Sequence, residues 1–265
     1  MTDPSYATIA LTNPLAHVLQ VTLNRPEVAN AFNTQMATDL MHCFENLALD
    51  AGDYRCVILT GAGERAFCAG GDLKERDGMS DAAWSAQHLV YERMIRAVID
   101  CPLPLIAAVN GAAFGGGCEL AAAVDFVYAS ENAYFAMTET SLGIIPGAGG
   151  TQNLARALGE RRAKELIMSA RRFSADDARK WGLVNEVFAA EQLLDEVLQT
   201  AARIAANAPL AVRQAKQAIH HGLQMSLADG LAFEIEAYNR TVPTDDRREG
   251  VSAFNEKRSP DFKGE

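Results

Sequence analysis

The chain has 265 residues and a net charge of −10, with 24 lysines and arginines against 34 aspartates and glutamates. This acidic excess disfavours nucleic acids and anionic membranes as partners, although a local basic patch could still hold a phosphate. The length suffices for one large core. No apolar run reaches membrane-spanning length, because Asn110, Glu119 and Asp125 interrupt the longest runs.

Five cysteines are scattered along the chain without a C-x-x-C spacing, and the five histidines show no spacing typical of metal ligands. This usage is typical of a reduced intracellular protein, and it predicts neither a disulfide framework nor a metal site. Residues 1–5 lack the basic and apolar parts of a signal peptide. We therefore expect a cytoplasmic protein without a bound metal.

The first 150 residues alternate short β-branched runs with helical periodicity. Asn33 can cap a helix over residues 34–50, and a second helix is expected over 81–99, before a proline-containing turn. Short apolar or alternating runs predict strands at residues 15–23, 56–60, 105–109 and 125–129. Strand, loop and helix repeated in this order predict an α/β core.

From about residue 150 onward the pattern is helical. Ser174 followed by Asp177 predicts a capped helix start. Further amphipathic helices are expected at about 190–206, 210–222, 226–240 and 245–257. We interpret residues 1–200 as the core that carries the site, and residues 201–265 as a helical region.

A glycine-rich and otherwise apolar stretch contains two acidic residues. Three consecutive glycines, at 115–117, precede Glu119, and Glu139 follows farther along the same stretch. Burying a carboxylate costs several kcal/mol unless it is paired or used. Glycines allow a ligand close to the backbone, and the N–H groups of a helix start favour negative charge. The stretch therefore predicts donors for an oxyanion beside a carboxylate that can act as acid or base.

A second glycine-bearing loop, at residues 63–74, follows a predicted strand directly. The order of elements allows both loops to meet at one edge of the sheet, where ligand sites of α/β proteins form. Two backbone N–H groups that converge on one carbonyl oxygen would polarise a thioester or a similar electrophile.

Three of these motifs together resemble the enoyl-CoA hydratase/isomerase (crotonase) family: the loop at residues 66–73, the run at 107–120 and the run at 143–152. The resemblance extends over nearly the whole chain, from Asn24 to Arg258. It implies a spiral of ββα units with a C-terminal helical region that supports trimers, often paired into hexamers. Residues 201–265 would be this trimerisation region.

The resemblance also implies roles for individual residues. Gly71 and Gly116 match the two donors of the oxyanion hole. Glu119 would orient or deprotonate water, and Glu139 would exchange the proton at Cα. The positions that match contacts to CoA are Ala69, Asp72, Leu73, Lys74, Phe254 and Lys257, the last two in a tail that could come from a neighbouring subunit. The expected reaction is hydration of a 2-enoyl-CoA, with CoA as part of the substrate and no separate cofactor.

Several alternatives stay open within this resemblance. Residues 137–140, 163–171 and 242–247 resemble the methylglutaconyl-CoA hydratases, some of which bind RNA through lysines of their first helix. Here the matching stretch, residues 34–53, contains neither Lys nor Arg, which disfavours a non-catalytic RNA-binding role. A Δ3,Δ2-enoyl-CoA isomerase needs only one carboxylate, so the presence of two favours a hydratase. A CoA-thioester hydrolase is a third alternative.

Structural explanations compete with each functional one. The glycines at 115–117 could serve only helix packing, Glu119 could only complement a helix dipole, and Glu139 could be a solvated turn residue. Cys68 and Cys118 lack a cationic neighbour in sequence, which indicates packing residues and not nucleophiles.

Overall fold

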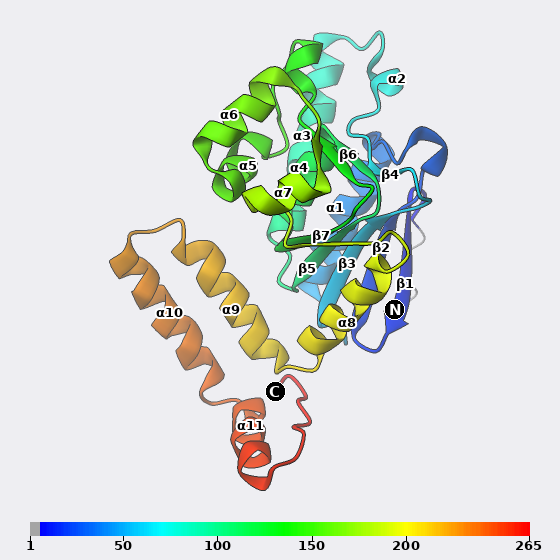
Figure 1. Cartoon of the computed structure of the whole chain (residues 1–265). Helices are drawn as coiled ribbons and strands as arrows, with labels where there is room; N and C mark the ends of the chain where they lie inside the picture. Colours follow the sequence, from blue (N-terminus) through cyan, green and yellow to red (C-terminus); the bar gives the residue numbers. More distant parts are fainter. Residues whose placement is uncertain (1–5) are drawn as a thin grey trace.

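The computed structural model describes residues 6–265, so the expectation about a signal peptide lies outside the described residues. Two β-sheets are surrounded by helices, and a helical arm extends from the C-terminal side (Figure 1). The large sheet has six strands in the order β1-β2-β3-β5-β7-β10. These strands are β1 Ile9–Leu15, β2 Val18–Leu23, β3 Cys56–Gly61, β5 Leu105–Val109, β7 Phe126–Ser130 and β10 Glu186–Phe188.

The first two strands form an antiparallel hairpin, and the following neighbours in the large sheet pair in parallel. The single strand expected over residues 15–23 is therefore wrong at its start. Leu15 ends β1 and Val18 begins β2, with His17 in the left-handed region at a φ of 63°. The apolar alternation continues across this two-residue turn, so the pattern alone does not reveal the reversal.

A small four-stranded sheet has the order β4-β6-β8-β9. Its strands are β4 Ala66–Cys68, β6 Ala112–Phe114, β8 Tyr134–Ala136 and β9 Phe173–Ser174. The pairs β4–β6 and β6–β8 are parallel, and β9 is antiparallel to β8. Three consecutive strand pairs thus repeat one pattern, in which the first strand joins the large sheet, the second joins the small sheet, and a helix follows. This arrangement confirms the expected spiral of ββα units.

The helices α1 Thr34–Leu49 and α3 Asp81–Ile99 cover one face of the large sheet, and α8 Leu193–Ala205 covers the other. Successive side chains of a strand point to opposite faces of the sheet. Val57 therefore packs on the side of α1 and α3, whereas the next residue, Ile58, packs on the side of α8. The Asn33 side chain accepts a hydrogen bond from Met36 N at 3.0 Å, which confirms the predicted cap of α1.

Shorter helices connect the two sheets. They are the α-helices α2 Leu73–Arg76, α4 Gly116–Ala123, α5 Gly150–Leu158, α6 Glu160–Ser169 and α7 Ala175–Trp181, with the 3-10 helices η1 Pro26–Val28 and η2 Glu139–Leu142. The Ser174 side chain accepts from Asp177 N at 3.1 Å, as the capping pattern predicted. Among the helices of residues 6–265, none combines the length and the apolar character needed to cross a bilayer.

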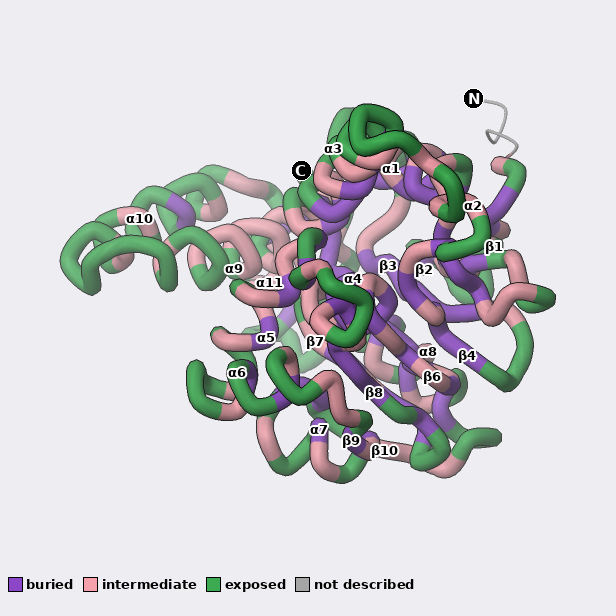
Figure 2. The backbone as a smooth tube through the Cα atoms, turned by 90° about the horizontal axis from the view of Figure 1, so that it is seen from above, coloured by how far each residue is buried: buried purple, intermediate pink, exposed green. Residues whose placement is uncertain are grey.

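The arm consists of α9 Pro209–Gly222, α10 Leu227–Thr241 and α11 Asp245–Glu256. In Figure 1, α9 and α10 lie side by side and extend away from the sheets, and Figure 2 shows α10 mostly exposed and α9 mostly of intermediate burial. Lys216 fastens α9 to the core, since its Nζ lies 2.7 Å from the Asp125 carboxylate. The division expected after residue 200 falls inside α8, whose Ala201 and Ala205 are buried against the large sheet.

Candidate active site

The two glycine-bearing loops meet at the carboxyl ends of β4 and β6. Because these strands are parallel neighbours, the chain leaves both of them on the same side of the small sheet. An ideal Cβ placed on Gly70, which has a φ of +90°, would lie 2.7 Å from Phe114 O and 3.1 Å from Gly116 N. Only glycine therefore permits this approach. Both glycine-bearing segments contain a short strand, β4 or β6, that was not predicted from the sequence. The loops therefore meet at the edge of the small sheet and not at the edge of the large one.

A cavity of about 550 Å³ opens beside these loops. Its walls come from the loop after β4, from α2 and α3, from the start of α4 and from residues 138–148. Six of the residues singled out from the sequence line it: Ala69, Gly71, Leu73, Gly116, Glu119 and Glu139. The structure thus brings both expected carboxylates and both expected donors into one cavity.

Both backbone amides are available to a ligand. Gly116 is the first residue of α4, so its N–H has no acceptor within that helix. The Gly71 N–H donates to no protein acceptor among residues 6–265, although Gly70 O and Asp72 N both bond to the backbone of Phe32. These two amides can therefore donate to an oxygen placed between the loops.

The glycine triplet also serves packing. An ideal Cβ on Gly117 would lie 2.0 Å from Cys68 O, and one on Gly116 would lie 2.4 Å from Cζ of the buried Phe32. Close packing thus explains the glycine at both positions. Gly116 serves this packing and also lines the cavity.

Glu119 lies in the first turn of α4 with only 3% of its surface exposed. Its Oε1 accepts hydrogen bonds from Ala148 N and Gly150 N, each at 2.8 Å. Burial raises the pKa of this carboxyl, while the backbone donors oppose the rise by favouring the ionised form. The two amides fix Oε1 in place, so the carboxylate is oriented before a ligand binds.

Glu139 begins η2 and is also buried. Its Oε2 has no hydrogen-bond partner within the part of the chain that the structure describes. Burial raises its pKa to about 7, and the negative charge of Glu119 adds to the rise. A carboxyl with this pKa can hold or release a proton near neutral pH, which is what general acid–base catalysis requires. The interpretation of Glu139 as a solvated turn residue is wrong.

Comparison with known proteins shows the family of the chain. The family model for enoyl-CoA hydratase/isomerase matches residues 15–265. The chain belongs to this family. A short-chain-enoyl-CoA hydratase of Clostridium acetobutylicum is 41% identical over 91% of this chain and 92% of its own. A 2,3-dehydroadipyl-CoA hydratase of Escherichia coli is 42% identical over 93% of this chain and 95% of its own. The crystal structure of an enoyl-CoA hydratase from Bacillus anthracis superposes with a TM-score of 0.95 at 45% identity, covering 98% of this chain and all of that one.

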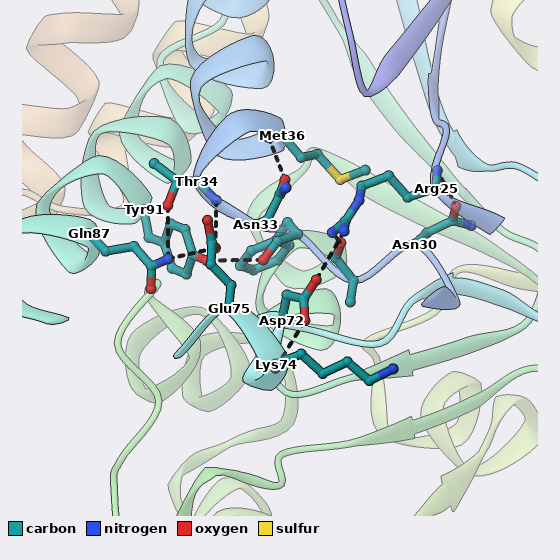
Figure 3. Close-up of polar contacts among 12 residues, drawn as sticks. Arg25, Asn30, Asn33, Thr34, Met36, Asp72, Lys74, Glu75, Gln87 and Tyr91 are labelled. Atoms are coloured by element: carbon teal, nitrogen blue, oxygen red, sulfur yellow. Dashed lines mark hydrogen bonds and ion pairs between the residues drawn. The ribbon is translucent and has the colours of Figure 1, made fainter. Parts of the chain in front are cut away.

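The residues matched to the CoA-binding positions of the family fall into two groups. Ala69 and Leu73 line the cavity beside the reacting groups. The Asp72 carboxylate pairs with Arg25 at 3.0 Å and accepts a hydrogen bond from Lys74 N at 3.1 Å, which holds the start of α2 (Figure 3). Lys74 is exposed on α2.

Phe254 and Lys257 are not brought to the cavity within one chain. Phe254 is exposed on α11, and Lys257 follows as its left-handed C-cap. In Figure 1, α11 lies at the opposite end of the molecule from α2 and α3, which border the cavity. A role in the cavity for these two residues would require a neighbouring subunit.

Sequence reasoning missed the side chains that α2 and α3 contribute to the cavity: Arg76, Trp84, Ser85, His88 and Tyr91. The available signal was Gln87, a polar residue in the buried stripe of α3 beside Tyr91 and Met94. Its amide donates to Thr34 and Glu75 (Figure 3) and accepts from Arg76, and so organises this wall.

Cys68 and Cys118 are fully buried next to the cavity. Burial raises the pKa of Cys68 to about 12, and it raises the pKa of Cys118 further above the usual range of a thiol. Neither thiol would ionise near neutral pH, which supports their interpretation as packing residues.

Proposed function

We propose that this member of the family is an enoyl-CoA hydratase that adds water across the double bond of a 2-enoyl-CoA thioester. The observation that carries the proposal is the presence of two buried carboxylates, Glu119 and Glu139, in one cavity with the unpaired amides of Gly71 and Gly116. Each part fits one requirement of the reaction.

The thioester carbonyl would lie between the N–H groups of Gly71 and Gly116. Addition at Cβ moves an electron pair toward this oxygen and forms an enolate, which the two donors stabilise by about 3–4 kcal/mol each. CoA belongs to the substrate, and the proposed steps transfer only hydroxide and protons between water, protein and substrate.

The two carboxylates would divide the proton transfers. Glu119, held by two backbone donors, orients water and takes its proton as hydroxide adds to Cβ. Glu139, with a pKa of about 7, gives its proton to Cα. One turnover leaves Glu119 protonated and Glu139 ionised, and proton exchange with water restores the starting state. In the reverse reaction Glu139 takes the proton from Cα, and Glu119 protonates the departing hydroxide.

A panel of enoyl-CoA esters tests the proposal by the loss of absorbance of the conjugated enoyl thioester. We expect hydration of crotonyl-CoA or a related 2-enoyl-CoA, and much slower conversion of a 3-enoyl-CoA. An isomerase would convert the 3-enoyl ester without adding water, and a hydrolase would release free CoA, which a thiol reagent detects. Either of these results without hydration would overturn the assignment.

The acyl group is the less defined part of the substrate. The two relatives with similar identity carry names for a short-chain ester and for the dicarboxylic 2,3-dehydroadipyl ester. The sequence resemblance to methylglutaconyl-CoA hydratases adds a branched dicarboxylic ester. Overall similarity therefore does not decide between neutral and carboxylated acyl groups, and the panel needs to contain both.

We also propose that the arm joins chains into a trimer or a hexamer. Its helices expose a series of large apolar side chains that one chain leaves uncovered: Ile219, Leu223, Leu227, Leu231, Ile235 and Tyr238. Sedimentation should give a species of three or six chains. Ile235→Glu should dissociate it, whereas Arg240→Gln on the exposed surface of α10 should not; a monomer at micromolar concentration would contradict the proposal.

A further inference from the structure

Arg76 places a guanidinium group on the wall of the cavity, close to Gly71. The residue ends α2 and lines the same cavity as Glu119 and Glu139. Its Cζ and Nη1 lie 3.7 and 3.8 Å from the position that a Cβ on Gly71 would occupy. The charge is therefore adjacent to one of the two amides assigned to the oxyanion hole.

The guanidinium is held in place before any ligand binds. Arg76 Nε donates to Gln87 Oε1 at 2.8 Å, and the buried Gln87 amide is itself fixed by Thr34 and Glu75 (Figure 3). The guanidinium carbon lies 4.2 Å from the ring centroid of Trp84 and 5.0 Å from that of Tyr91. Such stacking leaves the edge of the guanidinium free for a bidentate acceptor.

No carboxylate of residues 6–265 lies within ion-pair distance of Arg76, and its two Nη atoms donate to no acceptor there. The two nearest acids on its own segment are engaged elsewhere. Asp72 pairs with Arg25, and Glu75 accepts from Thr34 N and from the Gln87 amide. The guanidinium thus lies on the wall of the cavity beside Trp84 and Tyr91, with no acid of residues 6–265 paired to it.

We propose that Arg76 binds a carboxylate carried by the acyl chain, so that the substrate class is a 2-enoyl-CoA with a distal carboxylate. This inference rests on the proposed hydratase function and adds the residue that would determine its specificity. A partly buried cation is costly to leave without an anionic partner, and a neutral acyl chain would leave it so. A carboxylate would replace the missing partner with a charge-assisted pair.

Two esters of equal length test this inference, hex-2-enoyl-CoA and hex-2-enedioyl-CoA, which differ only in a terminal methyl or carboxylate. We expect the wild-type protein to have a kcat/KM at least about 10-fold higher for the diacid ester. Arg76→Met should lower that value by roughly 10²-fold and change the value for the neutral ester by less than about 3-fold. Arg76→Lys should recover part of the loss, because it restores charge without the planar fork. Arg93→Met, on the exposed surface of α3, is the matched control and should change neither value.

Calorimetric binding of adipoyl-CoA, hexanoyl-CoA and free CoA separates this inference from the proposed function, because saturated esters do not react. Preferential binding of adipoyl-CoA that Arg76→Met removes would support the inference even if neither enoyl ester were hydrated, a result that would overturn only the hydratase. Equal weakening of all three ligands would mean that Arg76 contacts the phosphates of CoA. That outcome, or an unchanged preference between the two esters in Arg76→Met, would overturn the inference.

Discussion

The cavity and the C-terminal arm shift the pKa of a glutamate in opposite directions. In the cavity, Glu139 is buried, its Oε2 has no hydrogen-bond partner among residues 6–265, and its pKa rises to about 7. In the arm, Glu249 lies at the surface, where hydrogen bonds from Arg258 and from Asp261 N lower its pKa to about 2. One carboxyl is poised to exchange a proton near neutral pH, and the other remains ionised throughout that range.

This difference separates residues that serve chemistry from residues that serve the fold. The ion pair of Glu249 joins α11 to the chain that follows it, in the same region where Asp246 accepts from Lys263 N and Gly264 N. Glu139 makes no comparable side-chain link. A buried carboxyl without a partner lowers stability, and its position in the cavity gives it a function that offsets this cost.

The largest expected effect comes from neutralising either cavity carboxyl. Glu119→Gln and Glu139→Gln each keep the approximate shape of the side chain but remove proton transfer, so we expect kcat for hydration to fall about 10²–10⁴-fold. Binding of CoA esters should change much less. The exposed Glu191→Gln is the control. Near wild-type turnover in either cavity variant would remove that residue from the mechanism.

A smaller loss is expected from Gly71→Ala. An added Cβ there would meet its nearest atoms, in Arg76 and Tyr91, at 3.7 Å, so the fold can accept it. The methyl group would displace the thioester from the oxyanion hole, and we expect kcat/KM to fall by about 10². An enolate mimic such as acetoacetyl-CoA should lose more affinity than free CoA; an equal loss would contradict the oxyanion assignment.

Gly116 is less suitable for the same test, although the sequence indicated it equally well. A side chain there would collide with the ring of Phe32, so Gly116→Val would disturb the core as well as the site. Overpacking of this kind typically costs about 1–3 kcal/mol. The strain at Gly116 would therefore extend into the core, and only the contact with Phe32, from a distant part of the sequence, reveals this.

The sequence predicted elements whose signals are local. Helix caps at Asn33 and Ser174 depend on residues within three positions, and the central strands β3, β5 and β7 are short apolar runs. The outer strands β1 and β10 of the large sheet were not predicted, because neither is a continuous apolar run. The small sheet was missed because β4, β6 and β8 have three residues each, too few to show a period. The turn at His17 was missed because the apolar alternation continues through it.

In the candidate site, too, some residues could be predicted from local sequence motifs and others only from tertiary contacts. Glu119, Glu139 and Gly116 lie in one glycine-rich stretch and Gly71 lies in a second loop, and the structure brings them together. Arg76 becomes part of the site only through tertiary contacts with Gln87 and Trp84 of α3. The tail positions Phe254 and Lys257 depend on an assembly, which no pattern within one chain can establish.

The pH dependence of the free energy of unfolding gives a prediction that compares the cavity with the arm directly. The pKa of Glu139 is raised from 4.5 to about 7, so the folded protein binds this proton more tightly than the unfolded chain. The free energy of unfolding therefore falls as pH rises from about 4.5 to about 7, and this cost remains above pH 7. At pH 8, Glu139→Gln should raise the free energy of unfolding by about 1–2 kcal/mol, allowing for water in the cavity. Urea unfolding at pH 8 and pH 5 should show this gain shrinking at the lower pH; a gain independent of pH would contradict the shift.

The smallest expected effect has the opposite sign and comes from Glu249→Gln. The pKa of Glu249 is lowered from 4.5 to about 2, so its contribution to stability is complete above about pH 4.5 and is lost as pH falls toward 2. At pH 8 the substitution should lower the unfolding midpoint slightly, since exposed ion pairs contribute little. The decrease should diminish in 1 M salt, which screens surface charges, and it should disappear in an Arg258→Met background, which already lacks the partner. The gain expected for Glu139→Gln should resist the same salt, because a buried carboxyl is little screened. Equal salt sensitivity in both variants would mean that the two carboxyls do not differ in environment as the structure indicates.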